Sequence, residues 1–409
     1  MDLLLKNIGL LATPVGSAAR KGAGQRDILL IQDAMVGVKD GEIAYAGPTD
    51  ESLKSADVFD CGGRLVTPGL VDAHTHLVFG GWRQKELALK LDGVPYLDIL
   101  KAGGGILSTV EHTRAASEAE LVAKGKALLS EMLSLGVTTC EAKSGYGLNT
   151  QCELKQLRII RSLDKAQPVD IVPTFMGAHA FPKEYAGNRN GYVEHLLTEM
   201  LPAVVGEGLA EFCDVFCETA VFTLDESRRI LLEAAKLGLS PKVHADEIDP
   251  IGGAEMAADV NAVSAEHLIQ TSDGGIRALA DKDVVAVLLP ATSFYLDKPF
   301  ARARDMVDAG VAVAVATDFN PGSSPSLNMQ LAMNLACMKY KLTPAETLTA
   351  VTLNGAAAIR RAGSCGSLEV GKQADLVVWD AEDLEYIFYR YGSNLVHTVV
   401  KKGDKICLS

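Results

Sequence analysis

Eight short apolar runs alternate with helical patterns through the middle of the chain, and this alternation restricts the fold more than any other feature. The runs are GLVDAHTHLVF (69–79), GVTTCEAKSGYG (136–147), VDIVPTFMGAHA (169–180), FCDVFCETAVF (212–222), SPKVHADE (240–247), NAVSAEHLI (261–269), DVVAVLLPATSF (283–294) and VAVAVATDFNPG (311–322). Between them lie amphipathic segments such as SRRILLEAAKLG (227–238), which ends at a glycine, as helices often do. Eight β/α units predict an α/β fold, a TIM (β/α)8 barrel. A doubly wound open sheet is the alternative, but no GxGxxG motif follows an early strand.

The two ends of the chain share a different pattern. Near the N-terminus AMVGVKDGEIAYAGP turns at Asp40-Gly41, and near the C-terminus HTVVKKGDKICLS turns at Gly403-Asp404. Such turns between short alternating runs are hairpin signals. Because neither end alone would form a stable sheet, we predict one composite β-sandwich domain from residues 1–66 and 362–409. The catalytic barrel of residues 67–361 is then inserted into it.

Composition narrows the class of protein. The chain has 409 residues, 48% of them hydrophobic, which is enough to bury a large core. A net charge of -13 without a basic run argues against a nucleic-acid partner. No uncharged apolar run reaches the length of a membrane span. The eight cysteines show no disulfide-type spacing, so we expect free thiols and a cytoplasmic protein.

Polar residues gather where the predicted strands end. In a barrel of this kind catalysis takes place at the carboxyl ends of the strands. In chain order these positions hold His74 and His76; Glu141, Lys143 and Tyr146; His179; Glu218; His244 and Glu247; Glu266 and His267; Ser293; and Asp318 and Asn320. Five of the eight histidines belong to this set, which indicates one shared site.

The first run places two histidines one residue apart. Side chains alternate along a strand, so His74 and His76 should project from one face. Two core histidines are the alternative, but burying both leaves four ring nitrogens in need of partners. A metal ion meets part of that need. With His244 and the Asp318 carboxylate added, the set fits a catalytic zinc or iron site with an open position for water.

Seven motifs carry a resemblance to a known family. They are HTHLVFGGWR (74–83), GGGILSTVEHTR (103–114), EAKSGYGL (141–148), GAHAFP (177–182), HADE (244–247), SAEHL (264–268) and ATDFNPGSSPS (316–326). The HxH pair is typical of the whole amidohydrolase superfamily. The KSGYGL, GGGI and TDFNPG runs are more specific, and the chain resembles the imidazolonepropionase family of histidine degradation. Trp82 stands where that family usually has a polar residue, and Ser323 where it often has threonine.

The resemblance implies a hydrolase that opens the ring of 4-imidazolone-5-propanoate to N-formimino-L-glutamate with a metal-activated water. It implies one divalent or trivalent ion per chain, zinc or iron, held by His74, His76, His244 and Asp318. The implied catalytic residues are Glu247, His267 and Asp318, the choice of base between the last two being open. The implied substrate-binding residues are Arg83, Tyr146, His179, Glu247, Asn320, Gly322 and Ser323. Of these, Arg83 would bind the propionate carboxylate through two parallel hydrogen bonds. Lys143 could serve in an ion pair or contact substrate.

Other readings stay open. Two-metal amidohydrolases use a carboxylated lysine after strand four, but FCDVFCETAVF contains none, which favours one metal. Another mononuclear amidohydrolase, acting on a cyclic amide or deaminating a nucleobase, is the main alternative, and Arg83 and KSGYGL argue against it. A non-catalytic scaffold protein is the third. The expected partner is a small-molecule substrate, and the resemblance suggests a homodimer.

Overall fold

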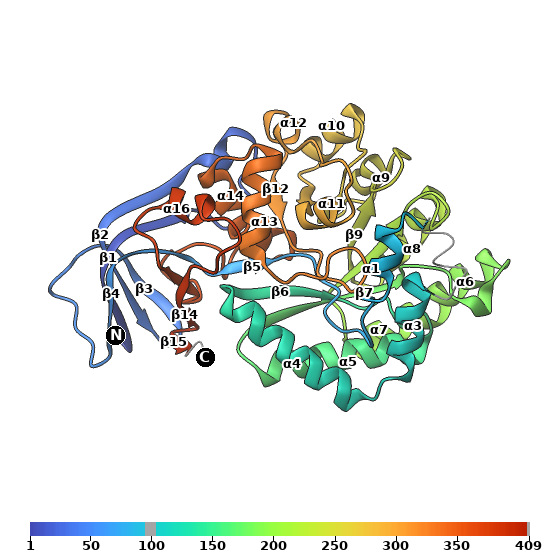
Figure 1. Cartoon of the computed structure of the whole chain (residues 1–409), viewed down its shortest axis with the longest axis horizontal. Coiled ribbons are helices and arrows are strands. Elements are labelled where there is room, and N and C mark those ends of the chain that lie inside the picture. Colours follow the sequence, from blue (N-terminus) through green and yellow to red (C-terminus); the bar gives the residue numbers. More distant parts are fainter. Residues whose placement is uncertain (95–103, 407–409) are drawn as a thin grey trace.

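The chain folds into two sheets that follow one another along the long axis of the molecule (Figure 1). This computed structural model describes residues 1–94 and 104–406. An eight-stranded sheet lies in the middle of the sequence, and a seven-stranded sheet is built from both ends. The expected Gly103 of the GGGI run and residues 407–409 of the last predicted hairpin lie outside the described residues.

The larger sheet is the predicted barrel. Its strands are β5 (Leu70–Asp72), β6 (Val137–Lys143), β7 (Asp170–Ala178), β8 (Phe212–Cys217), β9 (Ser240–Ala245), β10 (Ser264–His267), β11 (Val285–Leu288) and β12 (Val313–Val315). Neighbours in sequence are parallel neighbours in the sheet throughout. Most of these strand residues are buried, as in parallel sheets covered by helices.

The barrel closes between its first and last strands. The Thr317 hydroxyl donates to Asp72 Oδ2 over 2.6 Å, and the backbone N–H of Asp318 donates to the His74 carbonyl over 3.1 Å. The N–H of His76 donates to the Phe319 carbonyl over 2.8 Å. Regular strand β5 therefore ends at Asp72, earlier than the sequence pattern predicts. The two histidines lie in the extended segment that seals the barrel.

Most helices cover the outside of the barrel or connect its strands (Figure 1), whereas the turn at 22–26 and the helix at 384–389 lie between strands of the smaller sheet. The helices are α1 (Glu86–Leu91), α3 (Gly105–Ala115), α4 (Glu118–Ser134), α5 (Thr150–Ala166), α6 (Arg189–His195), α7 (Leu201–Gly206), α8 (Leu224–Lys236), α9 (Gly253–Asp259), α10 (Asp273–Asp281), α11 (Pro290–Tyr295), α12 (Ala303–Asp308), α13 (Met329–Leu335), α14 (Pro344–Ala350), α15 (Leu353–Ala358) and α16 (Leu384–Tyr389). Single turns η1 (Gly22–Arg26), η2 (Lys183–Tyr185), η3 (Leu196–Met200) and η4 (Ala336–Tyr340) complete the set.

Helix α8 illustrates why these segments are helical. The Thr223 side chain accepts from the backbone N–H of Glu226, whose carboxylate binds the Thr223 N–H in return. This capping box satisfies backbone donors that would otherwise lack partners. At the other end Gly238 has φ +95°, a left-handed conformation that glycine adopts without a steric penalty. The predicted helix thus begins and ends at recognisable signals.

The smaller sheet has the order β15-β14-β13-β4-β1-β2-β3. Its strands are β1 (Leu3–Pro14), β2 (Ile28–Lys39), β3 (Glu42–Pro48), β4 (Val58–Pro68), β13 (Leu376–Trp379), β14 (Val396–Lys401) and β15 (Asp404–Ile406). The first hairpin turns at Asp40 and Gly41, as predicted, and both have positive φ. The last turns at Lys402 and Gly403, one residue earlier than predicted. Strand β4 pairs with β1 on one side and β13 on the other, so each chain end needs the other.

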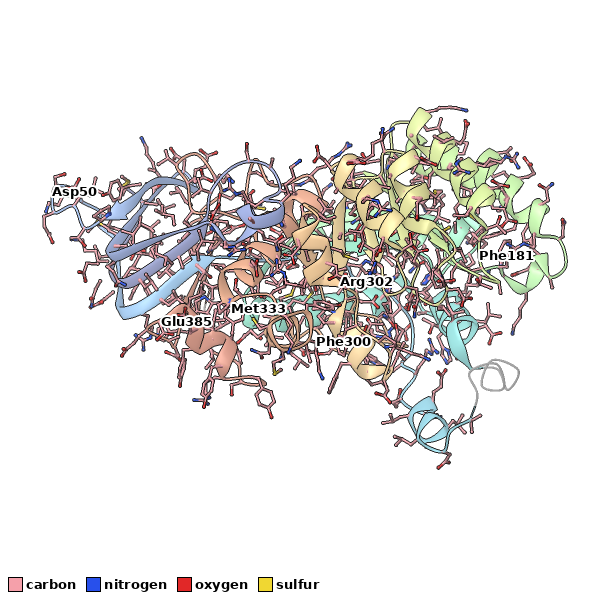
Figure 2. The ribbon with its side chains drawn as sticks, turned by 90° about the horizontal axis from the view of Figure 1, so that it is seen from above. Asp50, Phe181, Phe300, Arg302, Met333 and Glu385 are labelled. Atoms are coloured by element: carbon pink, nitrogen blue, oxygen red, sulfur yellow. The ribbon has the colours of Figure 1, made fainter. Side chains whose placement is uncertain are left out.

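The sheet from the chain ends packs against one end of the barrel, where β1 contacts α14 and β14 contacts α4. In Figure 2, Asp50 marks the far tip of this sheet and Phe181 lies near the opposite end of the molecule. The first and last described residues lie near each other beside this sheet (Figure 1). No helix within the described ranges is both long and apolar enough to cross a membrane.

Candidate active site

Four histidine rings converge at the carboxyl ends of the barrel strands. His74 and His76 follow β5, His244 is in β9 and His267 ends β10. The ring centroid of His74 lies 4.6 Å from that of His244, 5.4 Å from that of His76 and 5.7 Å from that of His267. All four side chains are buried, so the strand-end convergence predicted from sequence produces one compact cluster.

These rings form a candidate cation site. Burial lowers the pKa of His74, His76 and His267 well below its usual value, so their imidazoles are neutral and have lone pairs to offer. His74 Nε2, His76 Nδ1 and both ring nitrogens of His244 are buried without a hydrogen-bond partner among the described residues. One ligand atom each of His74, His76 and His244 lies within 4.8 Å of the others, a spacing that could hold a metal ion.

Asp318 adds a carboxylate to the cluster. Its Oδ1 lies 3.4 Å from His74 Nε2 and 3.7 Å from His76 Nε2, while Oδ2 accepts from the Thr292 hydroxyl over 2.6 Å. Burial raises the pKa of Asp318 to about 6. The residue has φ +53°. A non-glycine residue in this conformation is held there by its surroundings, and such strain is typical of functional sites.

His267 and Glu247 form a second pair beside the histidine cluster. His267 Nε2 lies 3.5 Å from Glu247 Oε2, and the His267 backbone also has positive φ, at +67°. Burial, together with the charges of Asp318 and Glu218, raises the pKa of Glu247 to about 8. The carboxyl is therefore protonated near neutral pH and can donate a proton. Glu218 accepts from the N–H of Ile248 over 2.7 Å and so fixes the loop that carries Glu247.

Tyr146 and His179 line the other side of His76. The His179 ring stacks on His76 with centroids 4.9 Å apart, and Tyr146 lies 5.3 Å from His179. The loop that carries Tyr146 is held by buried Glu153, which accepts from the N–H groups of Gly145, Gly147 and Leu148 over 2.7–3.0 Å. Sequence reasoning missed Glu153, because its role depends on a loop folding back onto α5.

Arg83 is held by an acidic neighbour. Its Nε and Nη2 donate to the two oxygens of Glu86 over 3.0 and 2.8 Å. Glu86 also accepts from the backbone N–H of Gly105 over 2.7 Å. The guanidinium lies so close to Gly322 that a Cβ built there would fall 2.1 Å from Nη1. A glycine is therefore required at position 322 if Arg83 is to approach the loop after β12, and this contact joins two predicted substrate-binding residues.

Asn320 shapes that same loop. Its amide nitrogen donates to the Asp318 carbonyl and to Ser323 Oγ, over 2.7 and 2.8 Å. Its carbonyl oxygen accepts from the N–H groups of Gly322 and Ser323. Both ends of the side chain are therefore engaged within the turn that follows Asp318.

Lys143 lies beneath the histidines in ion pairs. Its Nζ is 2.7 Å from both Glu141 and Asp214 and fully buried. Although burial opposes it, the charges of Asp214, Glu141 and Glu266 raise the pKa of Lys143 above its usual range. The alternative left open by the sequence is therefore resolved in favour of the ion pair.

Comparison with known proteins identifies the family of the chain. The amidohydrolase family model matches residues 65–406. The imidazolonepropionase of Bacillus velezensis is 52% identical over 409 residues, covering 99% of this chain and 97% of that protein. The imidazolonepropionase of Alkaliphilus metalliredigens is 53% identical over 413 residues, covering 99% and 98%. The chain belongs to the imidazolonepropionase group of the amidohydrolase family.

Solved structures share the fold at lower identity. A zinc-bound adenosine deaminase from Xanthomonas campestris has a TM-score of 0.72 at 23% identity, covering 99% of this chain and 92% of that one. An atrazine chlorohydrolase from Arthrobacter aurescens TC1, complexed with zinc, has a TM-score of 0.69 at 17% identity, covering 98% and 94%. Both share the overall fold of this chain over nearly its full length.

Proposed function

We propose that this protein hydrolyses 4-imidazolone-5-propanoate to N-formimino-L-glutamate. The observation that carries the proposal is the buried cluster of His74, His76, His244 and Asp318, in a chain about half identical to imidazolonepropionases along nearly its full length. Ring opening requires an activated water, a polarised carbonyl and a proton for the leaving ring nitrogen. The candidate site contains groups suited to each task.

We propose that His74, His76, His244 and Asp318 hold one metal ion, zinc or iron. The unpartnered nitrogens and the neutral state of the first two rings support this assignment. Imidazole and carboxylate ligands suit either metal. Such an ion, when bound, lowers the pKa of a water molecule and polarises a carbonyl oxygen.

Proton transfer is assigned to His267 and Glu247. Neutral His267, with Nδ1 unpartnered among the described residues, would accept a proton from the attacking water. Glu247, protonated near neutral pH, would donate to the ring nitrogen as the carbon–nitrogen bond breaks. His267 Nε2 lies 3.5 Å from Glu247 Oε2, so the ring would pass its Nε2 proton to Glu247 and keep the proton taken up at Nδ1. Proton exchange with solvent would then restore the starting tautomer of His267. Asp318 remains an alternative base.

The substrate's carboxylate is assigned to Arg83. A guanidinium offers several N–H donors, so Arg83 can bind a carboxylate while Glu86 orients it. Tyr146 and His179 would bind the ring from the side of His76. Gly322 and Ser323 would contact the substrate from the loop after β12, whose shape Asn320 maintains.

Turnover and metal content together test the proposal. We expect the purified protein to hydrolyse 4-imidazolone-5-propanoate and to contain one metal ion per chain by elemental analysis. His76→Ala should lose both metal and turnover. His267→Ala should keep the metal and lose most activity, because the ring is assigned to proton transfer. Release of ammonia from a nucleobase, with no activity on the imidazolone, would favour a deaminase instead.

A further inference from the structure

Five charged side chains lie completely buried inside the barrel, below the histidine cluster. They are Glu141, Lys143, Asp214, Lys242 and Glu266, each fully inaccessible to solvent. Interior charges are costly to bury, and replacing such ion pairs by apolar residues is often neutral or stabilising. Stability alone therefore does not explain three acids and two lysines in a barrel core, and their connections indicate another role.

The carboxylate of Glu141 joins the two lysines. Its Oε2 lies 2.7 Å from Lys143 Nζ and its Oε1 lies 2.8 Å from Lys242 Nζ. Oε1 also accepts from the Thr174 hydroxyl over 2.5 Å. The two amines come from different strands, β6 and β9, and Glu141 is the group that links them.

Each lysine reaches one histidine through a second carboxylate. On one side Lys143 Nζ lies 2.7 Å from Asp214 Oδ2, and that oxygen lies 3.0 Å from His244 Nδ1. The His244 contact is close but not aligned as a hydrogen bond, and its Nδ1 counts among the unpartnered atoms.

On the side of Lys242, the contact between the second carboxylate and the histidine has the geometry of a hydrogen bond. Lys242 Nζ lies 3.4 Å from Glu266 Oε1, and Glu266 Oε2 lies 2.8 Å from His74 Nδ1. An ionised Glu266 would accept the Nδ1 proton, leaving Nε2 of His74 as the lone-pair nitrogen. That Nε2 is the atom 3.4 Å from Asp318. Contacts of 2.7–3.4 Å therefore connect His74 through Glu266, Lys242, Glu141, Lys143 and Asp214 to His244. Those of Glu141 Oε2 and His244 Nδ1 are close ion-pair contacts without hydrogen-bond geometry.

We propose that Glu141, Lys143 and Lys242 are positioning residues that fix His74 and His244 for metal binding. The lysines hold the Asp214 and Glu266 carboxylates in place, and these carboxylates orient the two rings. Because Glu141 holds both lysines, a change at Glu141 should reach both histidines although it touches neither. Carboxylates behind ligand histidines fix the ring tautomer and orientation, and losing them weakens metal binding by about 10–100-fold. This inference rests on the metal site in the proposed function.

The test measures metal affinity without substrate. Glu141→Gln keeps the side chain's size and removes its charge. We expect the zinc dissociation constant, measured by competition with a chromophoric chelator, to rise about 10-fold or more. Thr174→Val provides a gentler change, since it removes one hydrogen bond to Glu141 and alters no charge. Thr174→Val should weaken zinc binding by a few-fold. It provides the test if Glu141→Gln does not fold.

Lys401→Met is the matched control. Lys401 is also a buried lysine between two carboxylates, Asp170 and Asp375, at 2.8 and 2.7 Å, but contacts no histidine. The Lys401→Met variant should unfold at lower urea concentration than the wild type and bind zinc with the same affinity. Zinc affinity within twofold of wild type in every folded variant at Glu141 and Thr174 would overturn the inference. If the wild type binds zinc and Glu141→Gln weakens it, but the imidazolone is not hydrolysed, the proposed reaction fails while the inference stands.

Discussion

Replacing Glu153 by glutamine should loosen the loop that carries Tyr146 while keeping the size of the side chain. In the native protein the two carboxylate oxygens accept bonds from the backbone N–H groups of Gly145, Gly147 and Leu148. Glutamine has only one acceptor oxygen. Its amino group must therefore face at least one of these N–H donors, so one bond is lost.

The size of the effect follows from these bonds. A hydrogen bond to a charged group contributes about 1.5–3 kcal/mol, and a neutral one about 1 kcal/mol. Glu153→Gln loses one charged bond and weakens two others. Burial raises the pKa of Glu153, which means that the ionised carboxylate is costly to bury, so the neutral amide offsets part of the loss. We expect the free energy of unfolding to fall by about 2 kcal/mol.

Urea unfolding and steady-state kinetics measure the two consequences. Tyr146 lies beside His76 and His179, so a misplaced loop should raise KM for the imidazolone about tenfold, equivalent to about 1.4 kcal/mol, at unchanged metal content. The control is Glu346→Gln on α14. Glu346 is also buried and accepts a backbone N–H, but from Thr343, outside the site. Glu346→Gln should lower the free energy of unfolding and leave KM for the imidazolone unchanged.

An unchanged KM in Glu153→Gln, in protein that has lost stability and kept its metal, would refute the reasoning. Tyr146 would then be placed by other contacts. A raised KM in Glu346→Gln as well would mean that general loosening, and not the loop, controls substrate binding.

Two further predictions concern Arg83 and Glu247. Arg83→Lys should raise KM by about one to two orders of magnitude on the natural substrate and have little effect on an analogue without the carboxylate, because lysine cannot make two parallel hydrogen bonds. Equal impairment on both compounds would instead make Arg83 a structural partner of Glu86. The folded protein raises the pKa of Glu247 to about 8, above its unfolded value, so the metal-free protein should lose stability as pH rises through 8. Glu247→Gln should flatten that dependence in urea unfolding from pH 6 to 9, and an unchanged pH slope would contradict the assignment.

The order of elements and the convergence of the candidate site residues could be predicted from the sequence. Strand-like runs with polar ends predicted the barrel. The helix predicted over residues 227–238 corresponds to α8 (Leu224–Lys236), which is followed by Gly238 with positive φ. His74, His76, His244 and Asp318 follow or end strands, so barrel topology alone brings them to one face. Local patterns were sufficient because each prediction depended on one segment and on one rule, that the carboxyl ends of the barrel strands meet at the same face.

Local sequence patterns could not predict which of the charged residues inside the barrel form ion pairs. Lys242 and Glu141 are separated by 101 residues, and their contact depends on the register between strands and on the tilt of the barrel. The alternation of Lys242 with His244 indicates a shared face, but not which acid lies opposite. Likewise β5 ends at Asp72 because the next residues seal the barrel against Phe319, a contact that no local pattern encodes.

The contacts that close the barrel between β5 and β12 also determine how early the site can form while the chain is being synthesised. Asp72 and Thr317 are 245 residues apart. At roughly 5–20 residues per second, roughly 10–50 s pass between their emergence from the ribosome. During that time the emerged part of the chain contains His74 and His76 but not Asp318. The barrel stays open because its last strand is missing. We therefore expect the metal to be acquired late, by a chain whose last barrel strand has joined the first.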